Sequence, residues 1–138
     1  MKIEFEVPGK AVGKGRPRFS RRSGRCYTPA KTSEYEISVA AACREAMGLM
    51  PPTIGPVQVS ISVWRSTPKS WEKKKNHDFF KERTVPRPDV DNIAKAILDG
   101  CNGIAYKDDA QVNSLYISKC YGPCDTTLVS IWIPDERI

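Results

Sequence analysis

The sequence has few of the residues on which several common kinds of enzyme depend. Histidine occurs once, at His77, and the five cysteines form no Cys-x-x-Cys pair. A Ser-His-Asp or Cys-His hydrolase would have to use that one histidine, which lies in a basic segment. The odd number of cysteines does not fit a disulfide framework, and Cys120 with Cys124 would supply only half of a zinc site. We therefore expect reduced thiols that serve as small apolar side chains.

Long hydrophobic runs are also absent. No apolar stretch approaches the roughly 20 residues that a helix needs to span a bilayer. The first seven residues alternate polar and apolar side chains, whereas a signal peptide has a continuous apolar region. We therefore expect no membrane partner and a cytoplasmic protein.

The charge is strongly segregated along the chain. The 138 residues carry a formal net charge of +6, which favours acidic partners such as nucleic acid. Residues 1–31 hold nine basic side chains against two acidic ones, and residues 65–87 hold eight against three. Residues 89–109 reverse the sign, with five aspartates against two lysines. An acidic segment that follows two basic ones requires a specific explanation.

Hydrophobic periodicity predicts one α/β (α+β) domain over residues 1–138, with a mixed sheet of about four strands and two to three helices. We expect strands at 2–7, 57–63, 111–121 and 126–133, from the alternation of apolar and polar side chains. Helices are expected from a Thr28 cap to Gly48, from Asp89 to Gly100 or Gly103, and, with weaker support, over 70–80. Glycine, proline and basic residues predict a mobile loop over 9–18, and prolines predict an extended segment over 84–88.

Four aspartates lie in two short segments that carry the chemistry. Asp89 and Asp91 stand at the start of the predicted second helix, and Asp108 and Asp109 precede a strand. A helix cap accounts for Asp89 but not for Asp91 or the later pair. Because neighbouring carboxylates repel one another unless a cation lies between them, we expect Mg²⁺ there, for which Mn²⁺ would substitute. A water on such an ion is a suitable nucleophile for phosphodiester hydrolysis.

Lys95 lies four residues after Asp91, so both side chains project from the same helix face, and Asp99 follows one turn later. One interpretation is a solvated ion pair between Asp91 and Lys95. The other is that the Lys95 ammonium faces a reacting phosphate and stabilises the charge that develops there.

Two other patterns are weaker. The run Gly9-x-x-x-Gly13-Lys14 differs from a phosphate-binding loop in spacing and lacks the following Ser or Thr, so we expect no nucleotide cofactor. Trp71 lies among lysines and either stacks on a nucleic-acid base or anchors a short amphipathic helix.

Taken together, these segments resemble the RusA-like Holliday-junction resolvases. The most specific part is Pro88-Asp-Val-Asp-Asn-Ile-Ala-Lys95 with Tyr106-Lys-Asp-Asp-Ala-Gln-Val112, accompanied by Lys14-Gly-Arg-Pro-Arg18, Tyr27-Thr-Pro29 and Leu98-Asp-Gly-Cys-Asn-Gly103. The resemblance implies a RusA-like fold and a Mg²⁺-dependent homodimer that cuts two strands of a four-way DNA junction symmetrically. It implies that Asp89, Asp91 and Asp109 are catalytic metal ligands, with Asp108 as a further candidate, and that Lys95 is the catalytic lysine.

The basic segments are expected to contact the DNA backbone. The candidate residues are Lys10, Lys14, Arg16, Arg18, Arg21, Arg22, Lys69, Lys73, Lys74 and Lys75. The sequence leaves two alternatives open: a nuclease for flaps or other branched DNA, and a non-catalytic nucleic-acid-binding module whose aspartates form caps and ion pairs.

Overall fold

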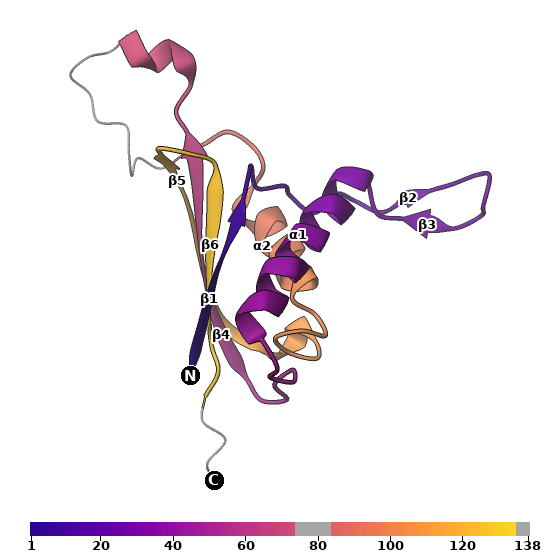
Figure 1. Cartoon of the computed structure of the whole chain (residues 1–138). Coiled ribbons are helices and arrows are strands. Elements are labelled where there is room, and N and C mark those ends of the chain that lie inside the picture. The colour runs from indigo at the N-terminus through magenta and orange to yellow at the C-terminus, as the bar shows by residue number, and fades with distance from the viewer. Residues whose placement is uncertain (74–83, 135–138) are drawn as a thin grey trace.

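The computed structural model describes residues 1–73 and 84–134 and is built around a four-stranded mixed sheet (Figure 1). The predicted fold class is confirmed. The strands are β1 (Lys2–Pro8), β2 (Arg18–Phe19), β3 (Cys26–Tyr27), β4 (Val57–Ser66), β5 (Val112–Gly122) and β6 (Thr126–Trp132). The α-helices are α1 (Ala30–Met47) and α2 (Val90–Gly100), and the 3₁₀ helices are η1 (Lys69–Lys73) and η2 (Asp109–Gln111).

The main sheet has the strand order β1-β6-β4-β5. Strand β6 runs antiparallel to both of its neighbours, whereas β4 and β5 are parallel. A parallel pair requires a crossover connection, and α2 lies within the connection from β4 to β5. This crossover brings the aspartates of α2 and of the turn before β5 to one side of the sheet.

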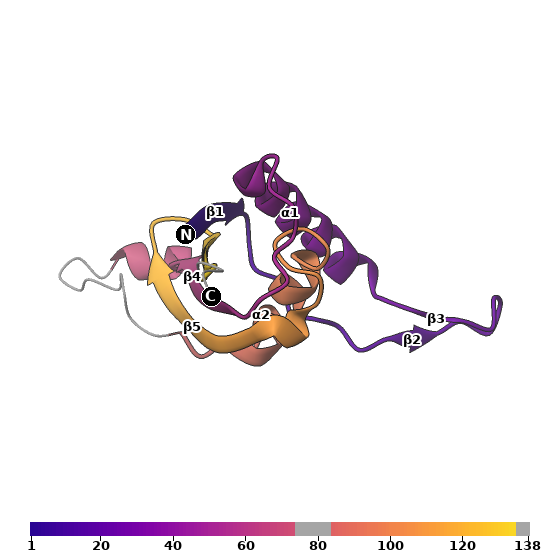
Figure 2. The same cartoon turned by 90° about the horizontal axis from the view of Figure 1, so that it is seen from below.

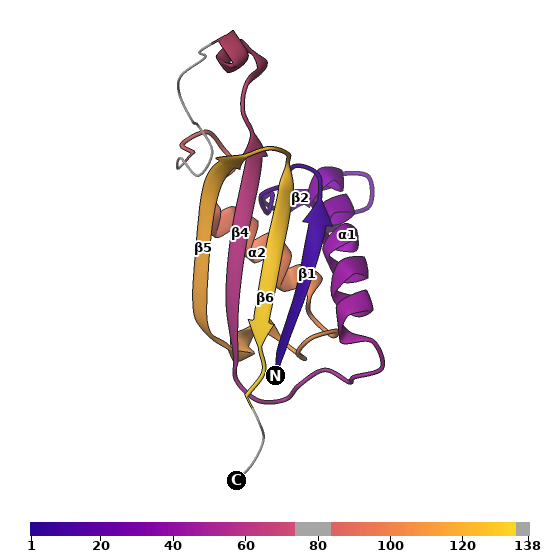
Figure 3. The same cartoon turned by 60° about the vertical axis from the view of Figure 1, so that its left-hand side comes forward.

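Both α-helices cover the same face of the sheet, and within residues 1–73 and 84–134 no helix lies over the opposite face (Figure 3). The alternation along β4 places Val57, Val59, Ile61 and Val63 against the helices, where all four are buried. The core is completed by apolar side chains of the helices and of the other strands, among them Ile3, Val7, Tyr35, Val39, Cys43, Met47, Ile93, Ala94, Ala96, Ile97, Val129 and Ile131. No helix within residues 1–73 and 84–134 is long and apolar enough to cross a bilayer.

The sequence predicts a mobile loop over residues 9–18, but part of this segment is held in place by hydrogen bonds. Its residues 13–15 are hydrogen-bonded between the two helices, and it continues into a hairpin formed by β2 and β3 that projects from the body of the protein (Figures 1 and 2). The hairpin was missed because each of its strands has two residues, too few for a period-2 pattern to be visible.

The helix boundaries also differ in detail from the sequence prediction. Pro29, not Thr28, is the N-cap of α1, and no side chain caps it. The helix predicted over 70–80 is a 3₁₀ helix at Lys69–Lys73, and the remainder lies outside the described residues, together with Lys74, Lys75 and His77. The ring of Trp71 packs edge-on against Tyr121, with 5.0 Å between ring centroids, as the anchoring interpretation expects.

Candidate active site

Helix α2 carries charged side chains on one side and core residues on the other. Asp89 is its N-cap, with φ −71° and ψ 150°, yet its carboxylate makes no capping hydrogen bond. Asp91 is exposed one turn before Lys95. Capping therefore does not occupy the Asp89 carboxylate, so the simplest structural explanation of this residue loses its support.

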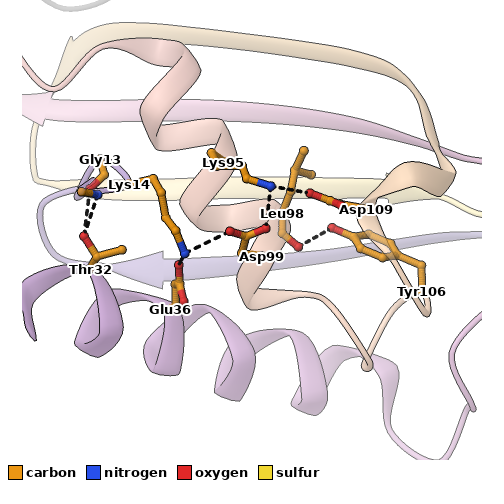
Figure 4. A network of polar contacts seen from close by, with 10 residues as sticks. Gly13, Lys14, Thr32, Glu36, Lys95, Leu98, Asp99, Tyr106 and Asp109 are labelled. Carbon is orange, nitrogen blue, oxygen red and sulfur yellow. Dashed lines mark hydrogen bonds and ion pairs between the residues drawn. The ribbon is translucent and has the colours of Figure 1, made fainter. Parts of the chain in front are cut away.

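The ammonium of Lys95 turns towards the C-terminal half of α2. It lies 3.1 Å from Oδ1 of Asp99 and 3.0 Å from Oδ2 of Asp109, which comes from the turn before β5 (Figure 4). The ion pair that the spacing suggested between Asp91 and Lys95 is therefore replaced by these two contacts. Lys95 remains 54% exposed, so its ammonium is held by two carboxylates while still facing solvent.

Lys14 continues this network behind Lys95. Its ammonium contacts Glu36 of α1 and Oδ2 of Asp99, at 3.0 Å from the latter, and its side chain is 22% exposed (Figure 4). Asp99 thus accepts from two lysines, one per oxygen. Lys14, predicted as a DNA contact, is engaged within the protein, where it joins α1 to α2.

The protonation equilibria reflect this arrangement. The hydrogen bond to Asp109, followed by that to Asp99, raises the pKa of Lys95 above its ordinary value. Burial lowers the pKa of Lys14, but the hydrogen bonds to Glu36 and Asp99 outweigh burial and leave that pKa raised. Both lysines are therefore cationic throughout the physiological pH range.

The turn that presents Asp109 is organised by Gln111. Its Oε1 accepts from the backbone N–H groups of Lys107 (2.9 Å) and Asp108 (3.1 Å), and its Nε2 donates to the carbonyls of Thr53 (2.9 Å) and Gly55 (2.8 Å). The backbone N–H of Gln111 donates to the carbonyl of Asp108 (3.0 Å), and Asp108 and Gln111 form a capping box at the start of η2. Asp108 therefore has a structural role, independent of any role as a ligand.

Residues 13–15 form the opposite wall of the site. The Lys14 N–H donates to the carbonyl of Asn92 (2.8 Å), and the Gly15 N–H donates to Thr32 Oγ1 (3.0 Å). A Cβ on Gly13 would lie 3.0 Å from Pro88, and a Cβ on Gly15 would lie 2.8 Å from Pro29. These two glycines thus permit a close approach of backbone to the helix N-termini, rather than conferring mobility.

The segment before Asp89 is fixed by basic side chains. The Lys119 ammonium donates to the carbonyls of Pro86 (2.8 Å) and Pro88 (2.9 Å), and Arg65 Nη1 donates to the carbonyl of Arg87 (2.6 Å). A pocket of about 430 Å³ lies beside this segment. It is lined by Ala11, Val12, Gly13, Lys14, Arg87, Pro88, Asp89 and Asn92.

The carboxylates have the donor chemistry of a magnesium site. Mg²⁺ prefers hard oxygen ligands, and Asp89 and Asp91 offer carboxylates for which the described residues supply no hydrogen-bond or ion-pair partner. Asp109 already has a cation beside it, the Lys95 ammonium. In the part of the chain that the structure describes, however, no three acidic, histidine or cysteine side chains gather closely enough to hold a metal ion.

The predicted DNA contacts fall into two regions. Arg16, Arg18, Arg21 and Arg22 are exposed on or beside the β2–β3 hairpin, and Lys10 is exposed just before residues 13–15. Lys69 is exposed in η1, at the opposite side of the molecule (Figure 1). Lys73 ends η1.

Comparison with known proteins assigns this arrangement to a family. The family model described as endodeoxyribonuclease RusA matches residues 8–132. The chain belongs to the RusA endodeoxyribonuclease family. A relative in Bacillus subtilis (strain 168), the uncharacterized protein YqaN, is 40% identical over 127 residues, which cover 86% of this chain and 87% of YqaN. RusA nucleases act on branched DNA and generally depend on a divalent metal ion, and this chain is accordingly an endodeoxyribonuclease.

Several residues of this RusA family member were not singled out as site residues by sequence reasoning. Asp99 was named only as lying one turn beyond Lys95, and Gln111 only as part of the run from Tyr106 to Val112. Glu36 and Lys119 were not named. Only Asp99 carried a local signal, because its i,i+4 spacing from Lys95 allows an ion pair. The contact of Glu36 with Lys14 spans 22 residues of sequence, and the contacts of Gln111 and Lys119 with backbone carbonyls span 31 to 58 residues. Local spacing therefore does not reveal them.

Proposed function

We propose that this protein is a Mg²⁺-dependent, structure-selective endodeoxyribonuclease that resolves four-way DNA junctions by paired symmetric nicks. The observation that supports this most strongly is the position of the Lys95 ammonium. The carboxylates of Asp99 and Asp109 hold this ammonium in place, and it remains exposed on the helix face that also carries Asp91. This arrangement suits a cation that must meet a phosphate without moving far.

The proposed site divides the work between the carboxylates and Lys95. Asp89, Asp91 and Asp109 would hold the divalent ion, which when bound supplies a water of lowered pKa and neutralises phosphate charge. Lys95 donates hydrogen bonds to a phosphate oxygen and stabilises the negative charge that develops on it. Asp99 is a positioning residue, because it holds both Lys95 and Lys14 through separate oxygens.

A homodimer follows from the symmetry of the substrate, because two opposed strands require two active sites related by a two-fold axis. The uncovered face of the sheet is the surface that we propose for it. Tyr116, Leu128 and Trp132 are exposed on this face, and no helix of the described residues covers it (Figure 3). A second copy of the chain would bury these side chains. Sedimentation equilibrium without DNA tests the dimer, and a strictly monomeric protein at micromolar concentration would exclude it.

The decisive experiment is cleavage of a labelled synthetic four-way junction, with flap and linear duplex as controls, in Mg²⁺ and in chelator. We expect paired symmetric nicks on the junction alone and only with metal. Cutting of flaps or duplex instead would retain the nuclease chemistry and reject the junction role. Binding without any cleavage would favour a non-catalytic nucleic-acid-binding module.

Asp91→Asn tests the chemistry of the site. We expect junction binding in chelator to be unchanged, while cleavage falls by at least about 100-fold, because an amide is a far poorer ligand for Mg²⁺ than a carboxylate. Glu45→Gln is the matched control, because Glu45 is exposed on α1 near β1 rather than at the site. An Asp91→Asn enzyme that cuts at the wild-type rate would refute the assignment.

A further inference from the structure

The β2–β3 hairpin is a projecting arm with little packing to support it. Strand pairing joins Arg18 to Tyr27 and Phe19 to Cys26, and a backbone hydrogen bond from the Ser20 N–H to the Arg25 carbonyl (2.9 Å) continues the hairpin. Gly24 adopts φ +68° in the turn, a conformation that suits glycine. All residues from 21 to 27 are exposed, and the arm extends away from both the sheet and the helices (Figures 1 and 2).

The arm is strongly basic, and no acidic side chain of the described residues pairs with its arginines. Residues 16–25 include five arginines and no lysine, and no acidic residue occurs between Glu6 and Glu34. In the described part of the chain, no side-chain hydrogen bond or ion pair engages any of the five guanidinium groups. Guanidinium groups bind phosphate oxygens in pairs and also stack on planar rings. The arm is therefore suited to a polyanion with planar groups.

The arm also exposes two aromatic rings. Phe19 is 64% exposed and Tyr27 is 49% exposed. Phe19 shares a face of the hairpin with its partner Cys26, and Tyr27 shares the other face with Arg18, because neighbouring positions along a strand alternate. Single exposed aromatic side chains are common on protein surfaces. Here, however, both lie among unpaired arginines, the combination with which proteins bind single-stranded nucleic acid through base stacking.

The base of the arm is attached directly to the active site. The hydrogen bonds of Lys14 and Gly15 to Asn92 and Thr32 lie immediately before the arm, and the Lys14 ammonium reaches Asp99 beside Lys95. About six residues separate the base from the tip, which corresponds to roughly 20 Å of extended strand. At about 3.4 Å per nucleotide, this length matches some six nucleotides of one DNA strand.

We propose that the β2–β3 hairpin is a branch-point arm, whose arginines hold the DNA backbone beyond the cleaved phosphate and whose Phe19 ring stacks on an unpaired base. This inference rests on the proposed function, because it takes branched DNA as the substrate. Because stacking is interrupted at a branch point, a base there can be unpaired at lower cost than a base within a linear duplex, so the arm would distinguish the two. A second copy of the chain is the less suitable occupant, because its own arm carries the same positive charge.

The test measures binding in chelator, so its result does not depend on cleavage. Phe19→Ala is compared with the wild type and with Phe19→Trp, using a junction that carries 2-aminopurine at the branch point and a linear duplex of the same sequence. Since stacking is lost with the ring, we expect junction affinity to fall by about tenfold and duplex affinity by less than about twofold. The change in 2-aminopurine fluorescence on binding should disappear in Phe19→Ala and return in Phe19→Trp.

The arginines give a second and separable readout. Replacing both Arg21 and Arg22 with Gln should weaken binding to junction and duplex alike, and should lower the slope of log affinity against log salt by about 1.8. Phe19→Ala should leave that slope unchanged, because the ring carries no charge. Since Phe19 is largely exposed, thermal unfolding of the variant should match the wild type.

Two results would overturn the proposal. The first is a Phe19→Ala protein that binds the junction within twofold of the wild type and keeps the fluorescence change. The second is a Phe19→Ala protein whose self-association weakens in sedimentation without DNA, which would assign the arm to protein contact. Failure of the proposed function is distinct, because it appears as wild-type protein that does not cut the junction in Mg²⁺.

Discussion

Gln111 offers the sharpest test of how the fold presents Asp109. The Gln111→Glu substitution keeps the side-chain length and both hydrogen bonds accepted from Lys107 and Asp108. It removes the two hydrogen bonds donated to the carbonyls of Thr53 and Gly55, and it places a carboxylate oxygen against those carbonyls instead. Gln58→Glu makes the same chemical change on the exposed surface of β4 and serves as the control for unfolding free energy alone, because Gln58 pairs with Trp132 on the sheet face proposed for the dimer.

The magnitude follows from the number of contacts. A hydrogen bond contributes about 0.5–1.5 kcal/mol net, and an unpaired or repelled acceptor adds to the loss, so we expect unfolding free energy to fall by about 2–3 kcal/mol at pH 8. For a domain of this size the midpoint of thermal unfolding should fall by roughly 6–12 °C. Urea unfolding, followed by circular dichroism, measures the free energy directly.

The pH dependence of the Gln111→Glu effect identifies its cause. Two facing carbonyls disfavour the ionised carboxylate, so the folded-state pKa of the new Glu should exceed its unfolded value of about 4.3. The folded state then binds more protons than the unfolded state between these values, and stability declines as pH rises through them. The loss of unfolding free energy relative to the wild type should therefore reach its full size at pH 8. It should be smaller near pH 5, where the protonated carboxyl group of the new Glu donates to one carbonyl.

The same substitution should affect catalysis. Loosening of the turn shifts Asp109 relative to Lys95, and we expect junction cleavage at pH 8 to fall by about tenfold or more while junction binding is retained. Equal stability of Gln111→Glu and Gln58→Glu at pH 8, within about 0.5 kcal/mol of the wild type, would refute the reasoning.

Two further predictions concern the packing and the charges around Asp99. In Gly100→Ala, the new Cβ would lie 2.8 Å from two atoms of Val39 and 3.1 Å from the carbonyl oxygen of Glu36, so we expect a loss of about 1–2 kcal/mol despite the better helix propensity of alanine. Val39→Ala removes one of the two Val39 contacts. A double-mutant cycle of Gly100→Ala and Val39→Ala, measured by urea unfolding, should therefore give a favourable coupling free energy. Strict additivity of the two losses would exclude a clash. The raised pKa values of Lys14 and Lys95 contribute stability that is fully present below about pH 10.4 and is lost as pH rises through the folded-state values. Lys14→Met should therefore flatten the decline of unfolding free energy between pH 9.5 and 11.5, and an unchanged slope would show that its ion pairs do not contribute.

The amino-acid sequence by itself determined the features that depend on local pattern. Alternation of apolar side chains placed β4 and the buried face of the sheet, and the helical pattern between Thr28 and Gly48 placed α1, whose buried side chains include Tyr35, Val39 and Cys43. These predictions succeeded because the face that an element buries is encoded by its own periodicity. The segment from Asp89 to Lys95 likewise carried the family resemblance, and with it the activity class, within a few consecutive residues.

The tertiary structure decided what surrounds those residues. Lys14, Glu36 and Asp99 lie up to 85 residues apart in sequence and become neighbours only when α1, α2 and the first loop pack together. Gln111 holds the Asp109 turn through carbonyls of Thr53 and Gly55, groups that every residue possesses and no sequence pattern marks. The direction in which Lys95 turns, away from Asp91 and towards Asp109, follows from the parallel crossover to β5. Such contacts depend on pairings between distant segments, and local periodicity contains no information about them.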